Sequence, residues 1–353
     1  RLVGSEMCIR DSSQSGGLGL LAAQWMIEGE PEWDMFAWDL ARFGDWADKA
    51  FTKARVRDQY MHRFKIHFPN EERAAGRPAM TRPAYEMQRG MGAVFGLNAG
   101  WEHPLWFADA PGTEDTNGFA RQNWFEPVGR EAAMLRDAVG VIDISNFGKY
   151  EVTGPGAGDW LDALVANHVP REIGKSCLTP LIGMRGGVAG DFTITMTGDE
   201  SYMMIGSGMA ERYHRRFFDM VPLPDGTGFE VATPRIAGFN VAGPRSREML
   251  AGLTDADLSN EGWRFMRSRR IAVGGVDCLA IRVSFTGDLG WELHCAVDDQ
   301  VALYEILLGR QPRMAAVRLA GGRSARSASK RATGPGDVNI RRNTGRRKPG
   351  FTG

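Results

Sequence analysis

The chain has 353 residues, enough for two or three domains, and 43% of them are hydrophobic, enough for a substantial core. No run approaches the roughly 18 apolar residues of a membrane-spanning helix, and the N-terminus lacks a signal-peptide pattern, so we expect no membrane partner and no secretion. The 43 basic and 43 acidic residues balance, but 12 of the basic and one of the acidic residues lie in 309–353, which leaves an acidic body and a basic tail.

The cysteines and histidines predict no metal site. The cysteines are few and far apart, without the paired spacing of a zinc site or a disulfide framework, which indicates reduced thiols in an intracellular protein. His62 and His67 are five residues apart and do not share one helical face, so we expect capping or surface roles for them. The cysteines are Cys8, Cys177, Cys278 and Cys295.

The N-terminal part begins with residues 1–12, which show no amphipathic period and resemble a cloning or assembly artefact. A glycine-rich turn at Gly16, Gly17 and Gly19 then leads into a helix that ends near Gly29. The spacing matches a dinucleotide-binding fingerprint only in part, because no buried strand precedes it. Free amides in such a turn can still contact a flavin or a phosphate, so these glycines are predicted FAD contacts.

The middle of the chain changes character at a loop. Residues 33–107 are rich in aromatic residues and arginine, with a helix expected at about 45–64 and a packed loop at 101–107, and the Pro-, Gly- and Asn-containing stretch 108–118 is the predicted boundary. Strands and helices then interleave irregularly, which favours an α+β fold. Helices are expected at 126–139, 159–166, 209–220 and 244–253, and strands at 141–144, 148–153, 201–205, 230–232, 237–241 and 271–273.

The stretch 186–195 combines a glycine-rich turn with a single acidic residue, Asp191, at the start of an alternating run. Phe192 and Ile194 alternate with threonines, and this period of two predicts a strand with one apolar and one polar face. By itself the pattern is compatible with an ordinary hairpin that exposes an aspartate. It is also compatible with a carboxylate placed for chemistry beside a closely approaching backbone or flat ligand, although the local pattern alone favours the hairpin.

A second hairpin is predicted at 278–294, with its turn around Thr286, Gly287 and Asp288. Its second strand carries Glu292 between Trp291 and Leu293. A buried carboxylate without donors destabilises a fold, so Glu292 either faces water or meets donors from a partner or ligand.

This hairpin, the strand 141–144 and the stretch 186–195 together resemble the folate-binding domain of the glycine-cleavage T-protein family, in its dimethylglycine and sarcosine dehydrogenase branch. That branch joins a flavin-dependent module to a T-protein-like half. The implied organisation is an artefactual N-terminus (1–12), the end of an FAD-dependent oxidoreductase module with its central linker domain (13–107), a linker (108–118), a T-protein-like folate-binding domain (119–308) and a basic tail (309–353).

The resemblance also implies roles for individual residues. Asp191 stands where the family places an acidic residue beside the reacting nitrogens of tetrahydrofolate, and Glu292 stands where a glutamate binds the pteridine edge. A carboxylate can accept paired N–H bonds, and a second one can relay a proton during one-carbon transfer. Phe285 occupies a position that is Tyr in many relatives and Asp288 one that is often Glu; with Arg282 they complete the predicted folate contacts.

The function implied for the intact parent is oxidative demethylation of a small N-methylated amine, a glycine derivative above all, on FAD, with the one-carbon unit passed to tetrahydrofolate. The substrate and the electron acceptor stay open, and the location is cytoplasmic, or the mitochondrial matrix in a eukaryote. One alternative is a folate-dependent aminomethyltransferase or methyltransferase without flavin. Another is a non-catalytic folate-binding module.

The basic tail 309–353 suggests a nucleic-acid arm at face value, but it lacks apolar periodicity and is predicted to be disordered. If codons from about Ser324 onward are read one base earlier, the tail can encode a segment that resembles the family's continuation. We therefore expect a frameshift, no nucleic-acid partner, and loss of an arginine that closes the folate pocket. Resequencing of the DNA tests this expectation.

Overall fold

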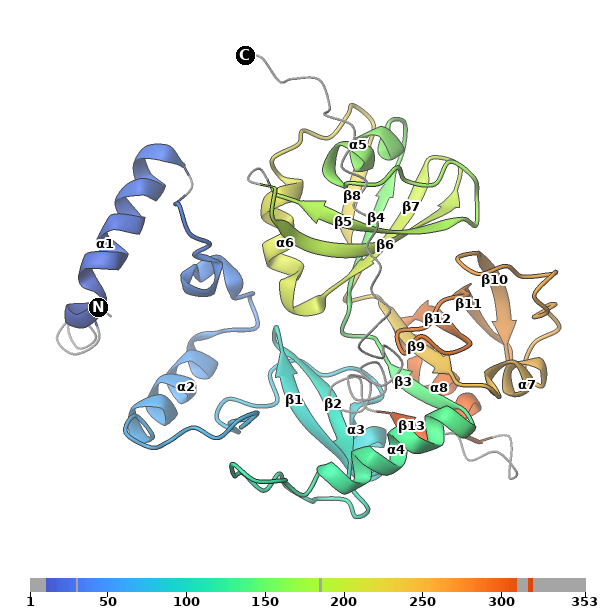
Figure 1. Ribbon diagram of the computed structural model, residues 1–353, viewed down its shortest axis with the longest axis horizontal. Coiled ribbons are helices and arrows are strands. Elements are labelled where there is room, and N and C mark those ends of the chain that lie inside the picture. Colours follow the sequence, from blue (N-terminus) through green and yellow to red (C-terminus); the bar gives the residue numbers. More distant parts are fainter. Residues whose placement is uncertain (1–10, 30, 184–185, 310–316, 320–353) are drawn as a thin grey trace, which may run out of the picture.

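The structure is a computed structural model that describes residues 11–29, 31–183, 186–309 and 317–319 (Figure 1). In these residues a two-stranded, a five-stranded and a six-stranded sheet are combined with helices, which confirms the α+β class. Among them, no helix is both long and apolar enough to cross a lipid bilayer. The helices are α1 (Asp11–Glu28), α2 (Lys49–Met61), α3 (Tyr85–Gly90), α4 (Phe125–Asp137), α5 (Ala157–Leu164), α6 (Glu211–Phe218), α7 (Ser246–Ala251) and α8 (Gln300–Gly309).

The strands of the two-stranded sheet are β1 (Ala93–Asn98) and β2 (Trp101–Phe107). The five-stranded sheet has the order β5 (Ser176–Ile182), β6 (Val188–Gly198), β7 (Ser201–Gly206), β4 (Gly148–Thr153) and β8 (Gly228–Val231). The six-stranded sheet has the order β10 (Ser268–Val273), β11 (Val276–Ile281), β12 (Gly290–Ala296), β9 (Ile236–Ala242), β3 (Gly140–Asp143) and β13 (Val317–Leu319).

Strand β6 confirms the alternation expected after the glycine turn, although it begins three residues before Asp191. Phe192 and Ile194 are fully buried in a core that also includes residues of α5 and α6. The polar face differs from the prediction, because Thr195 is fully buried as well and its hydroxyl lies 2.8 Å from the hydroxyl of Ser176. A second sheet packs against this face and buries Thr195, whereas Asp191 at the end of the face is exposed.

The predicted second hairpin is also confirmed. Strands β11 and β12 pair antiparallel, with Ile281 opposite Glu292. The face that carries Trp291 and Leu293 packs into a core with residues of α7 and α8. Since neighbouring side chains on a strand alternate, Glu292 lies on the other face.

The two larger sheets contact each other through that other face. Met203 and Ile205 of β7 pack against Leu279 and Ile281 of β11. Phe147, from the connection between β3 and β4, packs against the same cluster. We call this contact the sheet junction, and in Figure 1 it is the place where the green and orange sheets meet.

The N-terminal glycines do not form the expected turn. Gly16, Gly17 and Gly19 lie inside α1, where open space surrounds the position of each missing Cβ atom. Their amides come after the first four N–H groups of the helix, which are the ones left free for a ligand. The prediction of a glycine turn was wrong because these glycines continue the helical pattern of the residues after them.

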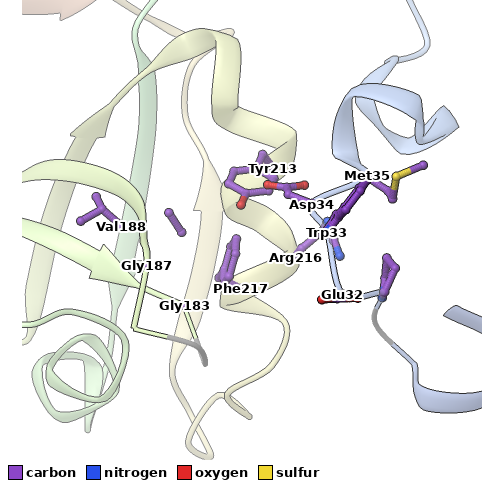
Figure 2. A pocket seen from close by; sticks show the side chains of 12 residues that line it. Glu32, Trp33, Asp34, Met35, Gly183, Gly187, Val188, Tyr213, Arg216 and Phe217 are labelled. Carbon is purple, nitrogen blue, oxygen red and sulfur yellow. The ribbon is translucent and has the colours of Figure 1, made fainter. Parts of the chain in front are cut away.

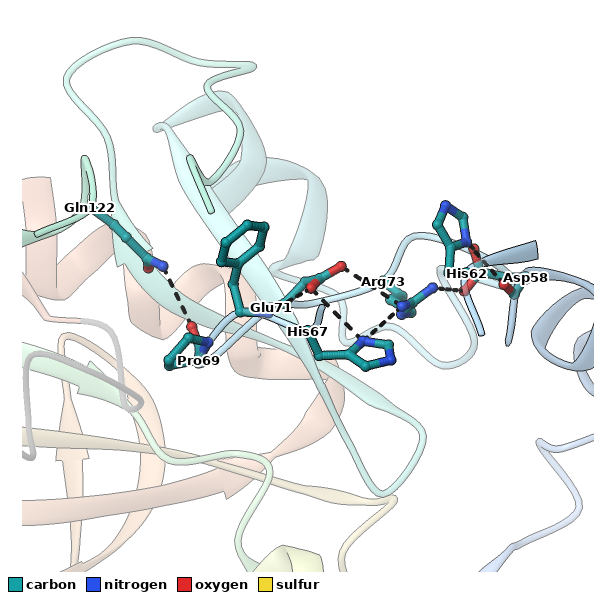
Figure 3. Close-up of polar contacts among 8 residues, drawn as sticks. Asp58, His62, His67, Pro69, Glu71, Arg73 and Gln122 are labelled. Carbon is teal, nitrogen blue, oxygen red and sulfur yellow. Dashed lines mark hydrogen bonds and ion pairs between the residues drawn. The ribbon is translucent and has the colours of Figure 1, made fainter. Parts of the chain in front are cut away.

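The loop after α2 is held by charged and polar contacts (Figure 3). Arg73 donates to Asp58 at 2.9 Å and to Nδ1 of His67 at 2.8 Å, while His62 is the C-terminal cap of α2, as expected. In the described part of the chain, no group of three or more His, Cys, Asp or Glu side chains is arranged to hold a metal ion.

Two further segments differ from the sequence expectation. Residues 101–107 form β2 instead of a loop, because they pair along their whole length with β1. In the tail, Val317–Leu319 form β13, which pairs parallel with β3 and takes up backbone groups at that sheet edge. The rest of the predicted disordered tail, 310–316 and 320–353, and residues 1–10 of the predicted artefact lie outside the described residues.

Candidate functional site

The register of the two sheets places both predicted carboxylates on facing surfaces. Thr193, two residues after Asp191 on the same face of β6, pairs with Ile205 of β7. Ile205 packs against Ile281 in the sheet junction, and Ile281 pairs with Glu292. Cross-strand partners share a face, so Asp191 and Glu292 lie on the sides of the two sheets that face each other.

Glu292 is a largely buried carboxylate with few donors. Its side chain is 14% exposed, and its Oε2 lies 3.5 Å from Nε2 of His294. Burial lowers the pKa of His294, although the neighbouring Glu292 opposes this shift, so the imidazole is a poor counter-ion near neutral pH. Among the described residues, the structure gives Glu292 no stronger partner.

Asn240 of β9 lies beside Glu292, its direct cross-strand partner. Its amide nitrogen has long contacts of 3.4 Å to the carbonyl oxygens of Val283 and Trp291. Its Oδ1 is buried and, in the described part of the chain, accepts no hydrogen bond. Two neighbouring acceptors that lack donors suit a ligand edge with several N–H groups, such as the aminopyrimidine ring of a folate.

Lys149 is a fully buried cation on the same side of the five-stranded sheet, because it pairs with Ile205. Its Nζ donates to the carbonyl oxygens of Ile144, Ser145 and Phe147, each at 3.1 Å. Burial lowers the pKa of Lys149 to about 7, and the carboxylate of Glu292 is among the groups that oppose this. The three bonds fix the connection from β3 to β4.

Arg82 contacts both connections between the two sheets, the one from β3 to β4 and the one from β8 to β9. Its guanidinium donates to the carbonyl oxygens of Ser145, Thr233 and Pro234, at 2.9, 2.8 and 3.2 Å, and stacks 3.8 Å from the centre of the Trp101 ring. Burial lowers its pKa to about 10. Together Arg82 and Lys149 fix the two connections, β3 to β4 and β8 to β9, by which the chain passes between the sheets.

The other predicted folate contacts separate into two groups. Phe285 is 44% exposed, and its ring centre lies 6.1 Å from that of Phe147, at the junction. Asp288 is half-buried in the turn that leads into β12. Arg282 instead donates to Asn260 and to the carbonyl oxygen of Trp263, on the side of the sheet away from Glu292.

Asp191 is exposed. The residue before it, Gly190, lies against the buried side chain of His214. His214 of α6 is fully buried, with Nδ1 3.1 Å from the hydroxyl of Tyr150. A Cβ atom added to Gly190 would come within 2.5 Å of Nε2 of His214. The close approach of α6 therefore requires glycine at position 190.

We expect Gly190→Ala to lower the free energy of unfolding by about 1–3 kcal/mol, since the buried imidazole has no room to move. Gly187→Ala is the matched control, because a Cβ atom there would meet nothing within 4 Å, and its effect should stay within about 0.5 kcal/mol. Urea unfolding of both variants measures the difference. Equal stabilities would show that the contact with His214 does not constrain the strand.

His214 should also make the protein sensitive to acid. Burial lowers its pKa to about 4, below the roughly 6.5 of an unfolded chain, so between these values the unfolded chain binds more protons. The contribution of His214 to stability should be constant above pH 6.5 and fall by about 3 kcal/mol as the pH drops to 4. Urea midpoints across this range should fall less steeply in His214→Phe than in the unchanged chain; parallel curves would contradict the assignment.

The residues present fit the two implied cofactors differently. Glu292, Asn240 and the Phe147–Phe285 pair offer acceptors and ring surfaces suited to tetrahydrofolate. The predicted FAD contacts, Gly16, Gly17 and Gly19, do not fit, because their amides are inside a helix.

Sequence reasoning missed Lys149, Asn240, Arg82 and His214. For Asn240 a signal was present, since it is the single polar residue of the otherwise apolar strand Ile236–Ala242. Lys149 gave no such signal, because it alternates with Tyr150 and Val152 as an exposed residue would. For Arg82 and His214 the partners are backbone groups or a glycine distant in sequence. No local pattern reveals such contacts.

Comparison with known proteins identifies two family matches. The GCVT N-terminal domain matches residues 84–328, and the FAD dependent oxidoreductase central domain matches residues 28–81. Human mitochondrial dimethylglycine dehydrogenase is 33% identical over 298 residues, covering 83% of this chain and 34% of that protein. Human mitochondrial sarcosine dehydrogenase is 28% identical over 335 residues, covering 83% of this chain and 36% of that protein. The chain thus spans about a third of these relatives' length.

A solved structure supports the fold. The glycine cleavage system aminomethyltransferase T from Bartonella henselae matches with a TM-score of 0.57 at 22% identity, covering 71% of this chain and 62% of that one. The chain therefore belongs to the glycine-cleavage T-protein (GCVT) family, and carries part of an FAD-dependent oxidoreductase central domain ahead of its GCVT domain, as in the predicted resemblance to dimethylglycine and sarcosine dehydrogenases.

Proposed function

We propose that this chain is the folate-binding part of an FAD- and tetrahydrofolate-dependent oxidative demethylase of N-methylated glycines. The observation that carries the proposal is the succession of an oxidoreductase segment at 28–81 and a GCVT domain at 84–328 in one chain. The relatives named for dimethylglycine and sarcosine support the class of amine substrate. Their names also support a mitochondrial matrix location if the source is eukaryotic.

The proposed chemistry uses residues at the sheet junction. Glu292 and Asn240 would accept N–H groups from the pterin edge, and Phe285 would pack against its ring. Asp191, on the facing sheet, would hold or move a proton near the nitrogens that receive the one-carbon unit. Tetrahydrofolate, when bound, supplies those nitrogens.

Two other functions stay as alternatives. A folate-dependent aminomethyltransferase without flavin is disfavoured by the oxidoreductase match at 28–81, since such an enzyme has no need of that segment. A non-catalytic folate-binding module keeps the pterin contacts but gives Asp191 no role.

Asp191→Asn separates these functions. Binding of 5-methyltetrahydrofolate to the chain, followed by tryptophan fluorescence, should be within about threefold of the unchanged chain, because Asn keeps the size and exposure of Asp. In the full-length protein, formation of methylene-tetrahydrofolate from dimethylglycine should fall by about 100-fold or more, since a proton relay is removed. Unchanged product formation would favour the module, and no folate binding by the unchanged chain would overturn the proposal.

A further inference from the structure

A cavity lies outside the sheet junction, between the oxidoreductase segment and the GCVT domain (Figure 2). It has a volume of about 210 Å³ and is formed by residues 31–35 on one side and by α6 and the β5–β6 turn on the other. Trp33, Tyr213 and Phe217 give it aromatic walls, and in Figure 2 Val188 lies on the side opposite Trp33. The cavity therefore requires both matched domains for its walls.

The cavity also presents one cation, Arg216, and two carboxylates, Glu32 and Asp34. Arg216 has ring contacts, 6.0 Å from the centres of both Trp25 and Tyr213, and among the described residues it forms no ion pair within 4.0 Å. Asp34 accepts the amide of Phe36 with Oδ1 at 2.9 Å and, in the same part of the chain, has no basic partner. Opposite charges are thus held near each other without neutralising each other.

The size and charges of the cavity restrict what it can bind. A volume of about 210 Å³ is below the roughly 300–1,000 Å³ of sites for drug-sized ligands, so a flavin or a complete folate is too large. A simple anion would be repelled by Asp34 and Glu32, and a simple cation would leave Arg216 without a counter-charge. A small zwitterion uses both charges, and aromatic faces favour a methylated ammonium group.

We propose that this cavity binds a zwitterionic N-methylated amino acid, with its carboxylate on Arg216 and its methylated ammonium against Trp33, Tyr213 and Asp34. The choice of methylated amino acids rests on the proposed function, whereas the requirement for a small aromatic-bound zwitterion rests on the cavity itself. The site is distinct from Glu292, since none of its lining residues belongs to the six-stranded sheet.

Isothermal titration calorimetry of the whole chain with dimethylglycine tests the proposal. We expect a dissociation constant in the millimolar range, in keeping with a ligand of few heavy atoms. Glycine, which lacks the methyl groups, and 3-methylbutanoate, which has carbon in place of the ammonium nitrogen, should each bind at least tenfold more weakly.

Variants locate the site. Arg216→Met and Trp33→Ala should each weaken dimethylglycine binding about tenfold or more. The matched controls are Arg215→Met, whose guanidinium pairs with Asp219 instead, and Trp38→Ala, an exposed tryptophan outside the cavity; both should bind as the unchanged chain does. No binding of dimethylglycine, equal binding of glycine, or equal effects of variants and controls would each overturn the proposal.

A parallel titration with 5-methyltetrahydrofolate keeps this proposal separate from the proposed function. Folate binding without dimethylglycine binding overturns only the cavity assignment. Dimethylglycine binding that depends on Arg216 and Trp33, without folate binding, supports the cavity and overturns the folate function.

Discussion

Lys149→Met should lower the free energy of unfolding by about 3 kcal/mol, among the largest effects that a single substitution in this chain can have. Methionine fills a similar volume, so the loss comes from hydrogen bonds and not from a cavity. All three carbonyl oxygens lose the Nζ donor; that of Ser145 keeps its bond from Arg82 and that of Ile144 keeps its bond from the amide of Phe147, so the Phe147 carbonyl oxygen is the one most affected. Urea unfolding followed by circular dichroism measures the change.

Removing the buried charge of Lys149 also removes its desolvation cost, which opposes this loss of stability. We expect the loss to exceed the gain, since the ammonium group has three donors and the structure supplies three acceptors. Lys175→Met, at an exposed lysine, is the matched control and should change stability by no more than about 0.5 kcal/mol. A Lys149→Met protein as stable as this control would show that the connection from β3 to β4 does not depend on the lysine.

Strand alternation was enough to predict the elements around both carboxylates. The buried Phe192 and Ile194 in β6, and Trp291 and Leu293 in β12, follow the period of two directly. The position of Glu292 on the opposite face then follows from the same period. Local patterns of this kind are fixed by which face meets the core, so a single sequence reveals them.

The packing of the two sheets against each other could not be predicted from strand alternation. Thr195 looks solvent-facing in sequence, but it is fully buried because a second sheet covers it. Asn240 and Lys149 belong to the site through register with Glu292 and Ile205, which are distant in sequence. The predicted glycine turn at Gly16 was wrong because the local glycine content suggested a break at a place where the helix continues.

Glu292→Gln should weaken binding of 5-methyltetrahydrofolate by roughly 10- to 100-fold, the range expected when a charge-assisted hydrogen bond becomes a neutral one and one acceptor oxygen is lost. Glutamine keeps the shape of glutamate, and the partner that the structure gives the carboxylate is His294 at 3.5 Å, so the fold should tolerate the change. Asp277→Asn, on the neighbouring strand with a side chain 73% exposed, is the matched control and should leave affinity unchanged.

The folate affinity and the urea midpoint of Glu292→Gln together show whether Glu292 contributes to folding or to folate binding. If Glu292 only contributed to folding, the variant would unfold at lower urea but bind folate as before, because no ligand contact would be lost. If Glu292 accepts N–H groups of the pterin edge, affinity falls while the urea midpoint stays close to that of the unchanged chain. Fluorescence titration and urea unfolding on the same samples measure both quantities, and unchanged affinity in Glu292→Gln would remove the sheet junction as the folate site.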